Sequence, residues 1–352
     1  MTLFAAITFR DVEIRNRIVV SPMCEYSAKD GHPQMWHMVH LGSRAVGGAG
    51  LVLTEATAVE AIGRISDADT GIYEDAHVES WRPIAKFIRE QGAVAGMQLA
   101  HAGRKASMGA PFAGGKRLEI GSGGWEPVAP SAVAFAADYA KPRALTIDEI
   151  DGVVAAFRRA AERVLAAGFQ VIEIHAAHGY LLHEFLSPLS NQRTDEYGGS
   201  LENRWRLALR VVKAVREVWP EKLPLFFRVS ATDWVEGGWD LEQTVELAKK
   251  VKELGVDLVD ASSGGNVPSA KIPVGPGYQV RFAEEIRRKS GVATGAVGMI
   301  TDAAQADTIV STGQADMVFL ARQLLRDPYW PRRAAKVLEV KIKAPVQYER
   351  AW

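Results

Sequence analysis

Residues 146–175 read TIDEIDGVVAAFRRAAERVLAAGFQVIEIH and join a helical pattern to a strand pattern. Apolar side chains recur at helical spacing from Ile147 to Ala167, which predicts an amphipathic helix. Thr146 and Glu149 form a capping box, a pattern typical of a helix start. The apolar, β-branched run Val171–His175 then predicts a buried strand, so this stretch indicates a helix that leads directly into a strand.

The same alternation runs along the whole chain. Short apolar runs recur, and stretches of helical periodicity lie between them. The predicted strands are Arg17–Ser21, Gly50–Glu55, Val94–Leu99, Val171–His175, Leu225–Val229, Leu258–Ala261, Ala293–Val297 and Asp316–Leu320. This pattern favours an α/β fold, a (β/α)8 TIM barrel of parallel strands and crossover helices. A doubly wound open sheet is the alternative.

The length of the chain is compatible with one barrel. A chain of 352 residues suggests two domains of about 150 residues, but barrels of this class reach about 250 residues or more in one domain. We expect one domain over residues 1–352, with an N-terminal lead-in and a C-terminal tail. The Gly-, Ala- and Pro-rich stretch Ala100–Leu145 is too long for an ordinary loop. Because it follows the third predicted strand, we expect it to cover the active site.

Composition argues against several classes of function. The 42 basic and 42 acidic residues balance and are scattered, so no charged patch suits nucleic acid or an anionic membrane surface. No apolar run is long enough to span a bilayer, and the start lacks the pattern of a signal peptide. The single cysteine, Cys24, cannot form an internal disulfide, which is typical of a reducing compartment. We expect a cytoplasmic protein with no nucleic-acid or membrane partner.

Polar side chains gather where the predicted strands end. In a TIM barrel these ends form one rim, and the active site lies there. The polar residues at or near the strand ends are Cys24, Tyr26, Gln98, His101, His175, His178, Tyr180, Arg228 and Arg322. This concentration is the main functional signal in the sequence.

His175, His178 and Tyr180 follow the fourth predicted strand. Two histidines can bind a carbonyl oxygen or a nitro group together and stabilise the negative charge that develops on it. Tyr180 lies in a glycine-containing loop, where its hydroxyl can act as a general acid. The alternatives are buried structural side chains and a metal site, but no acidic or cysteine partner stands at ligand spacing. We therefore expect no bound metal.

Arg228 stands inside an otherwise apolar strand. A guanidinium is almost never buried without a partner, so Arg228 either faces a ligand or forms an internal ion pair, for which Glu173 is the candidate. Gly298 and Arg322 end the last two strands, and the run Ser262–Gly265 ends the sixth. The loops after the seventh and eighth strands are the usual phosphate site of this fold, so we expect a phosphate there.

Four segments together carry a family resemblance. They are Ser21-Pro22-Met23-Cys24, Gln98 with His101–Lys105, His175–Tyr180, and Ser187–Ser200 with Asn203 and Arg204. With them the chain closely resembles the Old Yellow Enzyme family of flavin-dependent ene reductases over essentially its whole length. Within that family it looks like the thermophilic-like, xenobiotic-reductase and chromate-reductase class. The residues that carry this finer likeness are Cys24, Glu55-Ala56-Thr57 and the tail Pro345–Trp352.

The resemblance implies that FMN binds non-covalently at the barrel mouth. Around the flavin ring it implies Ser21, Pro22, Met23, Cys24, Ala56 and Gln98, with Arg228 at the N1 edge. Around the ribityl chain and phosphate it implies Ser262, Gly264, Gly298, Ala321 and Arg322. In these roles Arg228 stabilises the negative charge of the reduced flavin, and Cys24 tunes the flavin potential rather than attacking substrate.

The activity implied by the resemblance is the reduction of activated C=C bonds. NAD(P)H, with NADPH favoured, reduces FMN by hydride transfer. An α,β-unsaturated aldehyde, ketone or nitroalkene then takes its place in a ping-pong cycle. His175 and His178 would bind the oxygen of this substrate, Tyr26 would contact it, and Tyr180 would protonate its α-carbon from the opposite face.

The resemblance also implies a shared site between subunits. Arg350 occupies the place of a tail arginine that reaches a neighbouring active site, so we expect a homodimer or a dimer of dimers; a frayed terminus is the alternative. Two positions depart from the family pattern. Val297 stands where some relatives have tryptophan, and Ala321 stands where relatives usually have glycine.

Three other functions fit a barrel less well. A lyase or aldolase would need a Schiff-base lysine in a late strand, and none of the fourth to eighth strands offers one. A metal-dependent hydrolase lacks ligands, and a ligand-binding barrel without catalysis would not need the two histidines and the tyrosine.

Overall fold

A computed structural model describes residues 2–352, and eight parallel strands close into a barrel at its centre. The barrel strands are β3 (Ile18–Val20), β4 (Leu51–Ala58), β5 (Val94–Ala100), β8 (Val171–Ala176), β9 (Leu225–Ser230), β10 (Leu258–Ser262), β11 (Ala293–Val297) and β12 (Met317–Leu320). Their order around the barrel is β10-β11-β12-β3-β4-β5-β8-β9. The predicted TIM barrel is therefore confirmed, and the open-sheet alternative is wrong.

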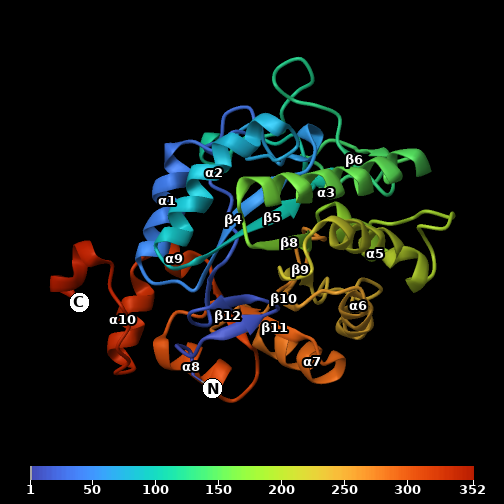
Figure 1. The fold of residues 1–352 in the computed structure, drawn as a ribbon. Helices are drawn as coiled ribbons and strands as arrows, with labels where there is room; N and C mark the ends of the chain where they lie inside the picture. The colour runs from blue at the N-terminus through green and yellow to red at the C-terminus, as the bar shows by residue number, and fades with distance from the viewer. Residues whose placement is uncertain (1) are drawn as a thin grey trace.

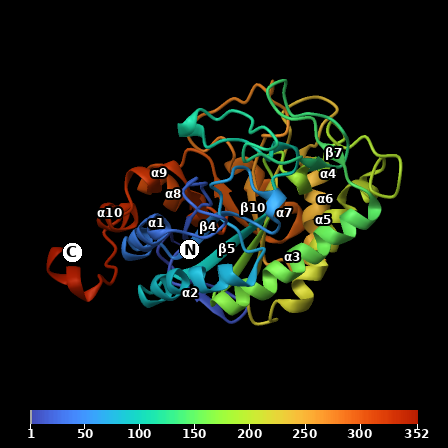
Figure 2. The same cartoon turned by 90° about the horizontal axis from the view of Figure 1, so that it is seen from above.

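Helices surround this barrel, as Figures 1 and 2 show. They are α1 (Met35–Val46), α2 (Asp75–Glu90), α3 (Ile147–Ala167), α4 (Leu181–Leu186), α5 (Leu201–Val218), α6 (Leu241–Glu253), α7 (Val280–Ser290), α8 (Ala303–Ser311), α9 (Arg322–Arg326) and α10 (Trp330–Val337). Every connection between consecutive barrel strands passes through at least one helix, as parallel strands require.

The helix α3 begins and ends where the sequence predicts. The Thr146 hydroxyl accepts a hydrogen bond from the Glu149 N–H at 3.2 Å, and the Glu149 carboxylate accepts one from the Thr146 N–H at 2.8 Å. Gly168 ends the helix with a φ of 88°, a conformation that favours glycine. The buried face of α3 includes Phe157 and packs into the main core between helices and barrel.

The strand bounds agree with the sequence prediction to within a few residues. The largest difference is in β4, which continues to Ala58 instead of ending at Glu55. The ladder between β4 and β5 shifts register between Leu53 and Ala56 and then resumes, so the strand passes through an irregularity that the apolar pattern does not reveal.

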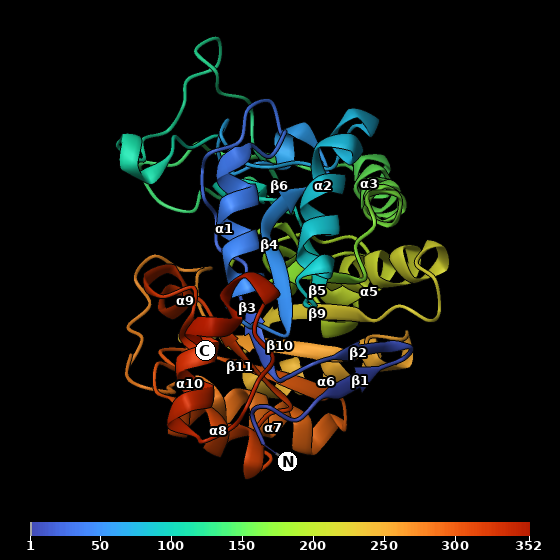
Figure 3. The ribbon, with the colours of Figure 1, turned by 60° about the vertical axis from the view of Figure 1, so that its left-hand side comes forward.

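The N-terminal lead-in covers the end of the barrel at which the strands begin. It forms a hairpin of β1 (Ile7–Phe9) and β2 (Val12–Ile14), which Figure 3 shows beside the barrel strands. Phe9 packs edge-on against Phe226 with ring centroids 5.3 Å apart, and Phe226 lies near the amino end of β9. The hairpin therefore covers an apolar cluster at the amino ends of the strands, opposite the mouth.

The segment after β5 projects beyond the barrel in Figure 1. It contains η2 (Gly103–Lys105), η3 (Pro111–Ala113) and the parallel strands β6 (Val128–Ala129) and β7 (Arg143–Ala144); a further short helix, η1 (Ala61–Gly63), follows β4. The tail ends in η4 (Val346–Ala351), which lies at the periphery near α10 (Figure 2). Between residues 2 and 352, no helix is long and apolar enough to cross a membrane.

Candidate active site

The turn after β8 brings His175, His178 and Tyr180 together. His178 has a φ of 60° and Gly179 a φ of 71°, and this sharp reversal folds the chain back over the strand end. A Cβ at Gly179 would meet the Gly265 carbonyl oxygen at 2.3 Å, so only glycine fits. The His175 ring lies 5.2 Å from the His178 ring and 5.0 Å from the Tyr180 ring, measured between centroids.

Both histidines are held as neutral imidazoles. Burial lowers the pKa of each well below its usual value, and the nearby Arg228 charge lowers it further. The His175 Nδ1 accepts a hydrogen bond from the Ala177 N–H at 3.2 Å, so its proton is on Nε2. The main-chain N–H of His178 donates to the Ser230 hydroxyl at 2.9 Å, and the ring Nε2 of His178 lies 2.7 Å from the Ser262 hydroxyl. A neutral imidazole with a fixed N–H is suited to donate to a substrate oxygen.

Tyr180 retains its proton at neutral pH. Burial raises the pKa of the phenol well above its usual value, and the neighbouring acidic groups Cys24, Tyr26 and Asp69 add to the effect. The Lys105 ammonium lies 5.4 Å from the centre of the Tyr180 ring. It also donates to the carbonyl oxygens of His178 at 2.8 Å and Gly265 at 2.5 Å. The segment after β5 thus contributes Lys105, the last residue of the His101–Lys105 motif, to the support of this turn; the sequence predicted no role for it.

The loop after β3 places Ser21–Cys24 and Tyr26 at the mouth. Ser21 is buried, and within residues 2–352 its hydroxyl has no hydrogen-bond partner. Burial raises the pKa of the Cys24 thiol, and the nearby Asp69 and Glu55 carboxylates raise it further, whereas a backbone hydrogen bond with Ala56 opposes the shift. The thiol is therefore neutral at physiological pH and poorly suited to act as a nucleophile.

The Tyr26 ring links this loop to the cover. Tyr26 has a φ of 48°, and its ring lies edge-on to that of Phe112 in η3, with centroids 6.3 Å apart. Cys24 lies beside the phenol of Tyr26, and burial raises the pKa of that phenol. Pro22 and Met23 are half-buried between these residues and the core.

Arg228 has an internal ion-pair partner, but the partner is Asp260 and not Glu173. The Arg228 Nε lies 2.8 Å from the Asp260 Oδ2, because these residues face each other in the β9–β10 register. Glu173 instead accepts a hydrogen bond from the Gln98 Nε2 at 2.7 Å. Asp260 was not among the predicted residues.

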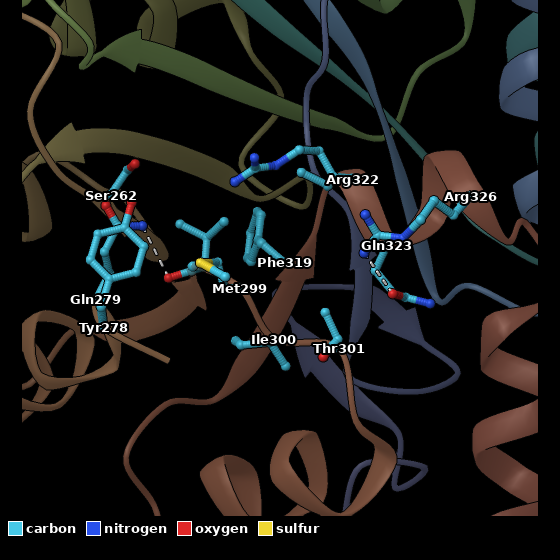
Figure 4. A pocket seen from close by; sticks show the side chains of 13 residues that line it. Ser262, Tyr278, Gln279, Met299, Ile300, Thr301, Phe319, Arg322, Gln323 and Arg326 are labelled. Carbon is cyan, nitrogen blue, oxygen red and sulfur yellow. Dashed lines mark hydrogen bonds between the residues drawn. The ribbon is translucent and has the colours of Figure 1, made fainter. Parts of the chain in front are cut away.

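The residues predicted for the phosphate border a cavity of about 280 Å³, shown in Figure 4. Its walls include Ser262, Gly298, Ala321 and Arg322, together with Tyr278, Gln279, Val297, Met299, Ile300, Thr301, Phe319, Gln323 and Arg326. In Figure 4 the Arg322 guanidinium extends across the cavity toward the side of Ser262. Arg322 is exposed and has no ion pair or hydrogen bond within residues 2–352, so it is available to an anion.

Gly298 allows the backbone to turn at the wall of this cavity. Its φ is 126°, and a Cβ there would lie 3.0 Å from the Gln279 Nε2. Gly264 is placed differently, because it does not line the cavity. Its N–H donates to the Thr232 carbonyl at 2.8 Å, and its own carbonyl accepts from the Ser230 hydroxyl at 2.8 Å. Gly264 therefore supports the loop that holds His178.

Two other residues lie away from this group. His101 is buried, accepts the Gly103 N–H at 3.1 Å and faces Glu60 at 3.4 Å, so its contacts are structural. Arg350 lies in the exposed η4 tail. Within residues 2–352, no group of three or more His, Cys, Asp or Glu side chains could hold a metal ion.

Comparisons with known proteins identify the family of this chain. The model of the NADH:flavin oxidoreductase / NADH oxidase family matches residues 2–341. The chain is 52% identical over 352 residues to an NADPH dehydrogenase of Geobacillus sp. (strain WCH70), covering 99% of this chain and 98% of that protein. It is 50% identical over 352 residues to an NADPH dehydrogenase of Bacillus subtilis (strain 168), with 99% of each covered.

Solved structures give the same result. Morphinone reductase in complex with tetrahydroNAD has a TM-score of 0.80 at 28% identity, covering 98% of this chain and 93% of that one. The Old Yellow Enzyme homologue from Zymomonas mobilis has a TM-score of 0.80 at 28% identity, covering 98% and 95%. The family and its NADPH dehydrogenases imply FMN as cofactor and NADPH as reductant. This chain is therefore an oxidoreductase that belongs to the NADH:flavin oxidoreductase / NADH oxidase family, as the Old Yellow Enzymes do.

Proposed function

We propose that this protein reduces electron-poor C=C bonds of α,β-unsaturated aldehydes, ketones and nitroalkenes at the barrel mouth, with NADPH as the electron donor. The observation that carries the proposal is the group of His175, His178 and Tyr180 on one turn after β8. Two neutral imidazoles and one protonated phenol supply donors for a developing negative charge and a proton for the carbon beside it.

The residues around the mouth are chemically suited to FMN. The unpartnered Ser21 hydroxyl and the neutral Cys24 thiol would contact the ring together with Pro22, Met23, Ala56 and Gln98. The phosphate would lie at the Arg322 end of the 280 Å³ cavity, with Ser262, Gly298 and Ala321 beside it. Gly264 would act through the Ser230 hydroxyl and the loop around it.

When bound, FMN would supply the redox chemistry, namely hydride transfer from NADPH and hydride transfer to the second substrate in two separate half-reactions. Arg228 would face the N1 edge of the ring, where its charge favours the reduced state. Its ion pair with Asp260 holds the guanidinium in the barrel interior.

The protein's own side chains then act on the alkene. His175 donates from Nε2 to the substrate oxygen, because its Nδ1 is occupied by the Ala177 N–H. His178 is held on Ser230 and Ser262, so its ring is fixed beside that oxygen. Tyr180 gives its phenolic proton to the α-carbon and regains one from water. Tyr26 and Phe112 border the substrate on the cover side.

We also propose that the protein works as a homodimer or a dimer of dimers in the cytoplasm, with Arg350 completing the site of a neighbouring subunit. The tail supports this proposal with exposed apolar side chains, since Val346 is 73% and Trp352 48% exposed. Trp352 stacks on Tyr329 at an interplanar angle of 10°, which gives the tail a defined shape. Exposed aromatic groups favour an interface.

One spectroscopic experiment tests the proposed activity. The purified protein, loaded with FMN, should show a flavin band near about 450 nm that NADPH bleaches without oxygen and that cyclohexenone restores. A protein that binds no FMN would contradict the cofactor assignment. A reduced flavin that oxygen reoxidises but electron-poor alkenes do not would contradict the assignment of the substrate class.

A further inference from the structure

Half of the barrel interior is polar just below the mouth. Side chains alternate along each strand, so every second residue faces inward. On the adjacent strands β5, β8, β9 and β10 these inward positions are Gln98, Glu173, Arg228 and Asp260. On the other strands the inward residues are apolar, such as Val19 and Phe319.

This polar group is almost completely buried. Glu173 and Asp260 are 0% exposed, Gln98 is 1% and Arg228 is 5%. Register pairs Gln98 with Glu173 and Arg228 with Asp260 on neighbouring strands. These pairs carry the hydrogen bond of 2.7 Å and the ion pair of 2.8 Å. The second oxygen of Glu173, Oε2, has no hydrogen-bond partner within residues 2–352.

The charges of this group do not balance when both acids are ionised. The group then holds two carboxylates and one guanidinium, which is ion-paired with Asp260, so the charge of Glu173 remains unpaired in the dry interior, where it is costly. Burial raises the pKa of Glu173, and the neighbouring Asp260 raises it further, against the opposing effect of Arg228. Asp260 is held by the ion pair, so Glu173 is the carboxyl that holds or releases the proton.

We propose that Glu173 is the proton acceptor that compensates charge when the flavin is reduced. This inference rests on the proposed FMN site, in which Arg228 and Gln98 contact the ring. Reduction of the flavin places a negative charge beside Arg228. The guanidinium then interacts with two anions, the reduced flavin and the Asp260 carboxylate. Protonation of Glu173 from solvent removes the excess negative charge next to them.

The electrons and protons of this step balance. NADPH delivers two electrons and one proton to the flavin. Above the pKa of Glu173, which burial raises to about 8, a second proton passes from water to the Glu173 carboxylate. When the alkene is reduced, it takes two electrons and one proton from the flavin and one proton from Tyr180. Glu173 then releases its proton to solvent. The net reaction is therefore the same as without Glu173: NADPH, one proton and the alkene give NADP+ and the reduced product.

The groups that face Glu173 come from three directions. Asp260 stands on β10 and Arg228 on β9, while Gln98 on β5 is uncharged. His175 is the next inward residue on the same strand, and it remains neutral because burial lowers its pKa. Within this group, therefore, only protonation of a carboxylate can compensate an added negative charge near Arg228.

The test is the pH dependence of the flavin midpoint potential in the FMN-loaded protein. For a two-electron couple, each proton taken up changes the potential by about 30 mV per pH unit. If Glu173 takes up a second proton, the plot of the wild-type midpoint potential against pH contains a segment between about pH 6 and about pH 9 that is steeper than 30 mV per pH unit and approaches twice that value. E173Q keeps a hydrogen-bonding amide beside Gln98 but cannot titrate, so its plot holds at about 30 mV per pH unit throughout.

E184Q is the matched control. Glu184 is also a carboxyl with 0% exposure and a pKa that burial raises, but it contacts the Arg104 N–H on the cover side instead of Arg228. Its plot should follow the wild type. A wild-type slope of about 30 mV at every pH, or a steep segment that persists in E173Q, would overturn the proposal.

A second measurement covers the case in which E173Q does not fold. The infrared difference spectrum of the wild type on reduction should gain a protonated-carboxyl band that shifts in D2O, and the absence of this band at alkaline pH overturns the proposal. Wild-type protein that fails to bind FMN would instead contradict the proposed function, so the two failures are distinguishable.

Discussion

Replacing Tyr180 by phenylalanine separates proton delivery from every other role of this side chain. The ring contacts with His175, at 5.0 Å, and with the Lys105 ammonium, at 5.4 Å, involve the aromatic ring and persist in the variant. Within residues 2–352 no group forms a hydrogen bond with the Tyr180 hydroxyl. We therefore expect the free energy of unfolding to change by less than about 0.5 kcal/mol.

The effect on alkene reduction should be large. A positioned general acid contributes about 10²- to 10⁴-fold, which is about 3 to 5 kcal/mol in the activation free energy. Burial raises the pKa of the phenol well above its usual value, so the proton is present throughout the physiological range. The loss of rate should therefore be the same between about pH 6 and about pH 9.

Stopped-flow kinetics of the two half-reactions provides the assay. Reduction of the flavin by NADPH should proceed at the wild-type rate in Y180F, whereas reoxidation by cyclohexenone should slow by the factor given above. A quinone acceptor takes its protons on oxygen, directly from water, and should reoxidise the variant normally. Y139F removes the hydroxyl of another half-buried tyrosine, from the cover, and serves as the control. Equal losses in both half-reactions would refute the role of Tyr180 as the specific proton donor.

Three further substitutions or reactions test separate parts of the site. R322A should weaken FMN binding roughly tenfold, because one charge-assisted contact is lost, without lowering the thermal stability of the apo-protein. Calorimetric titration measures the affinity and a thermal unfolding scan measures the stability, and unchanged affinity would place the phosphate elsewhere. Alkylation of Cys24 by iodoacetamide in the apo-protein should be more than about tenfold slower than that of a free cysteine at neutral pH, because burial raises the pKa of the thiol. Mass spectrometry follows the reaction, and rapid modification would contradict the neutral thiol. R350A should raise KM for NADPH or the alkene and leave the FMN content intact, and unchanged steady-state kinetics would remove the shared-site proposal.

The barrel was predictable because its signal repeats. Each strand is an apolar run followed by helical periodicity, and the capping box at Thr146 and the αL glycine Gly168 mark one helix unambiguously. The β1–β2 hairpin was not predicted, since strands of three residues are too short to show a period. The end of β4 was missed for a different reason, because its extension depends on pairing with β5 and not on its own residues.

Some of the site residues could also be predicted from the sequence pattern, and others could not. Residues at strand ends, such as His175, were predictable because the fold brings strand ends together. Asp260 was missed as the partner of Arg228, since the choice between it and Glu173 depends on the register between strands, which one sequence does not reveal. Gln279 and Tyr278 line the cavity from the loop between β10 and α7, where no periodic pattern marks them.

Three adjacent strands join the interior charges to the groups that we propose bind the substrate. On β8, β9 and β10 the charged residues are followed two positions later by groups at the mouth, which pairs Glu173 with His175, Arg228 with Ser230 and Asp260 with Ser262. Two residues of a strand span about 6.6 Å, so the charged layer lies directly below the layer that holds the His178 ring. The Arg228 charge lowers the pKa of both histidines across this distance. If the flavin and the substrate bind as proposed, a change in the charged layer would act on both the flavin potential and the pKa values of the two histidines, so the two half-reactions would not be tuned independently through these strands.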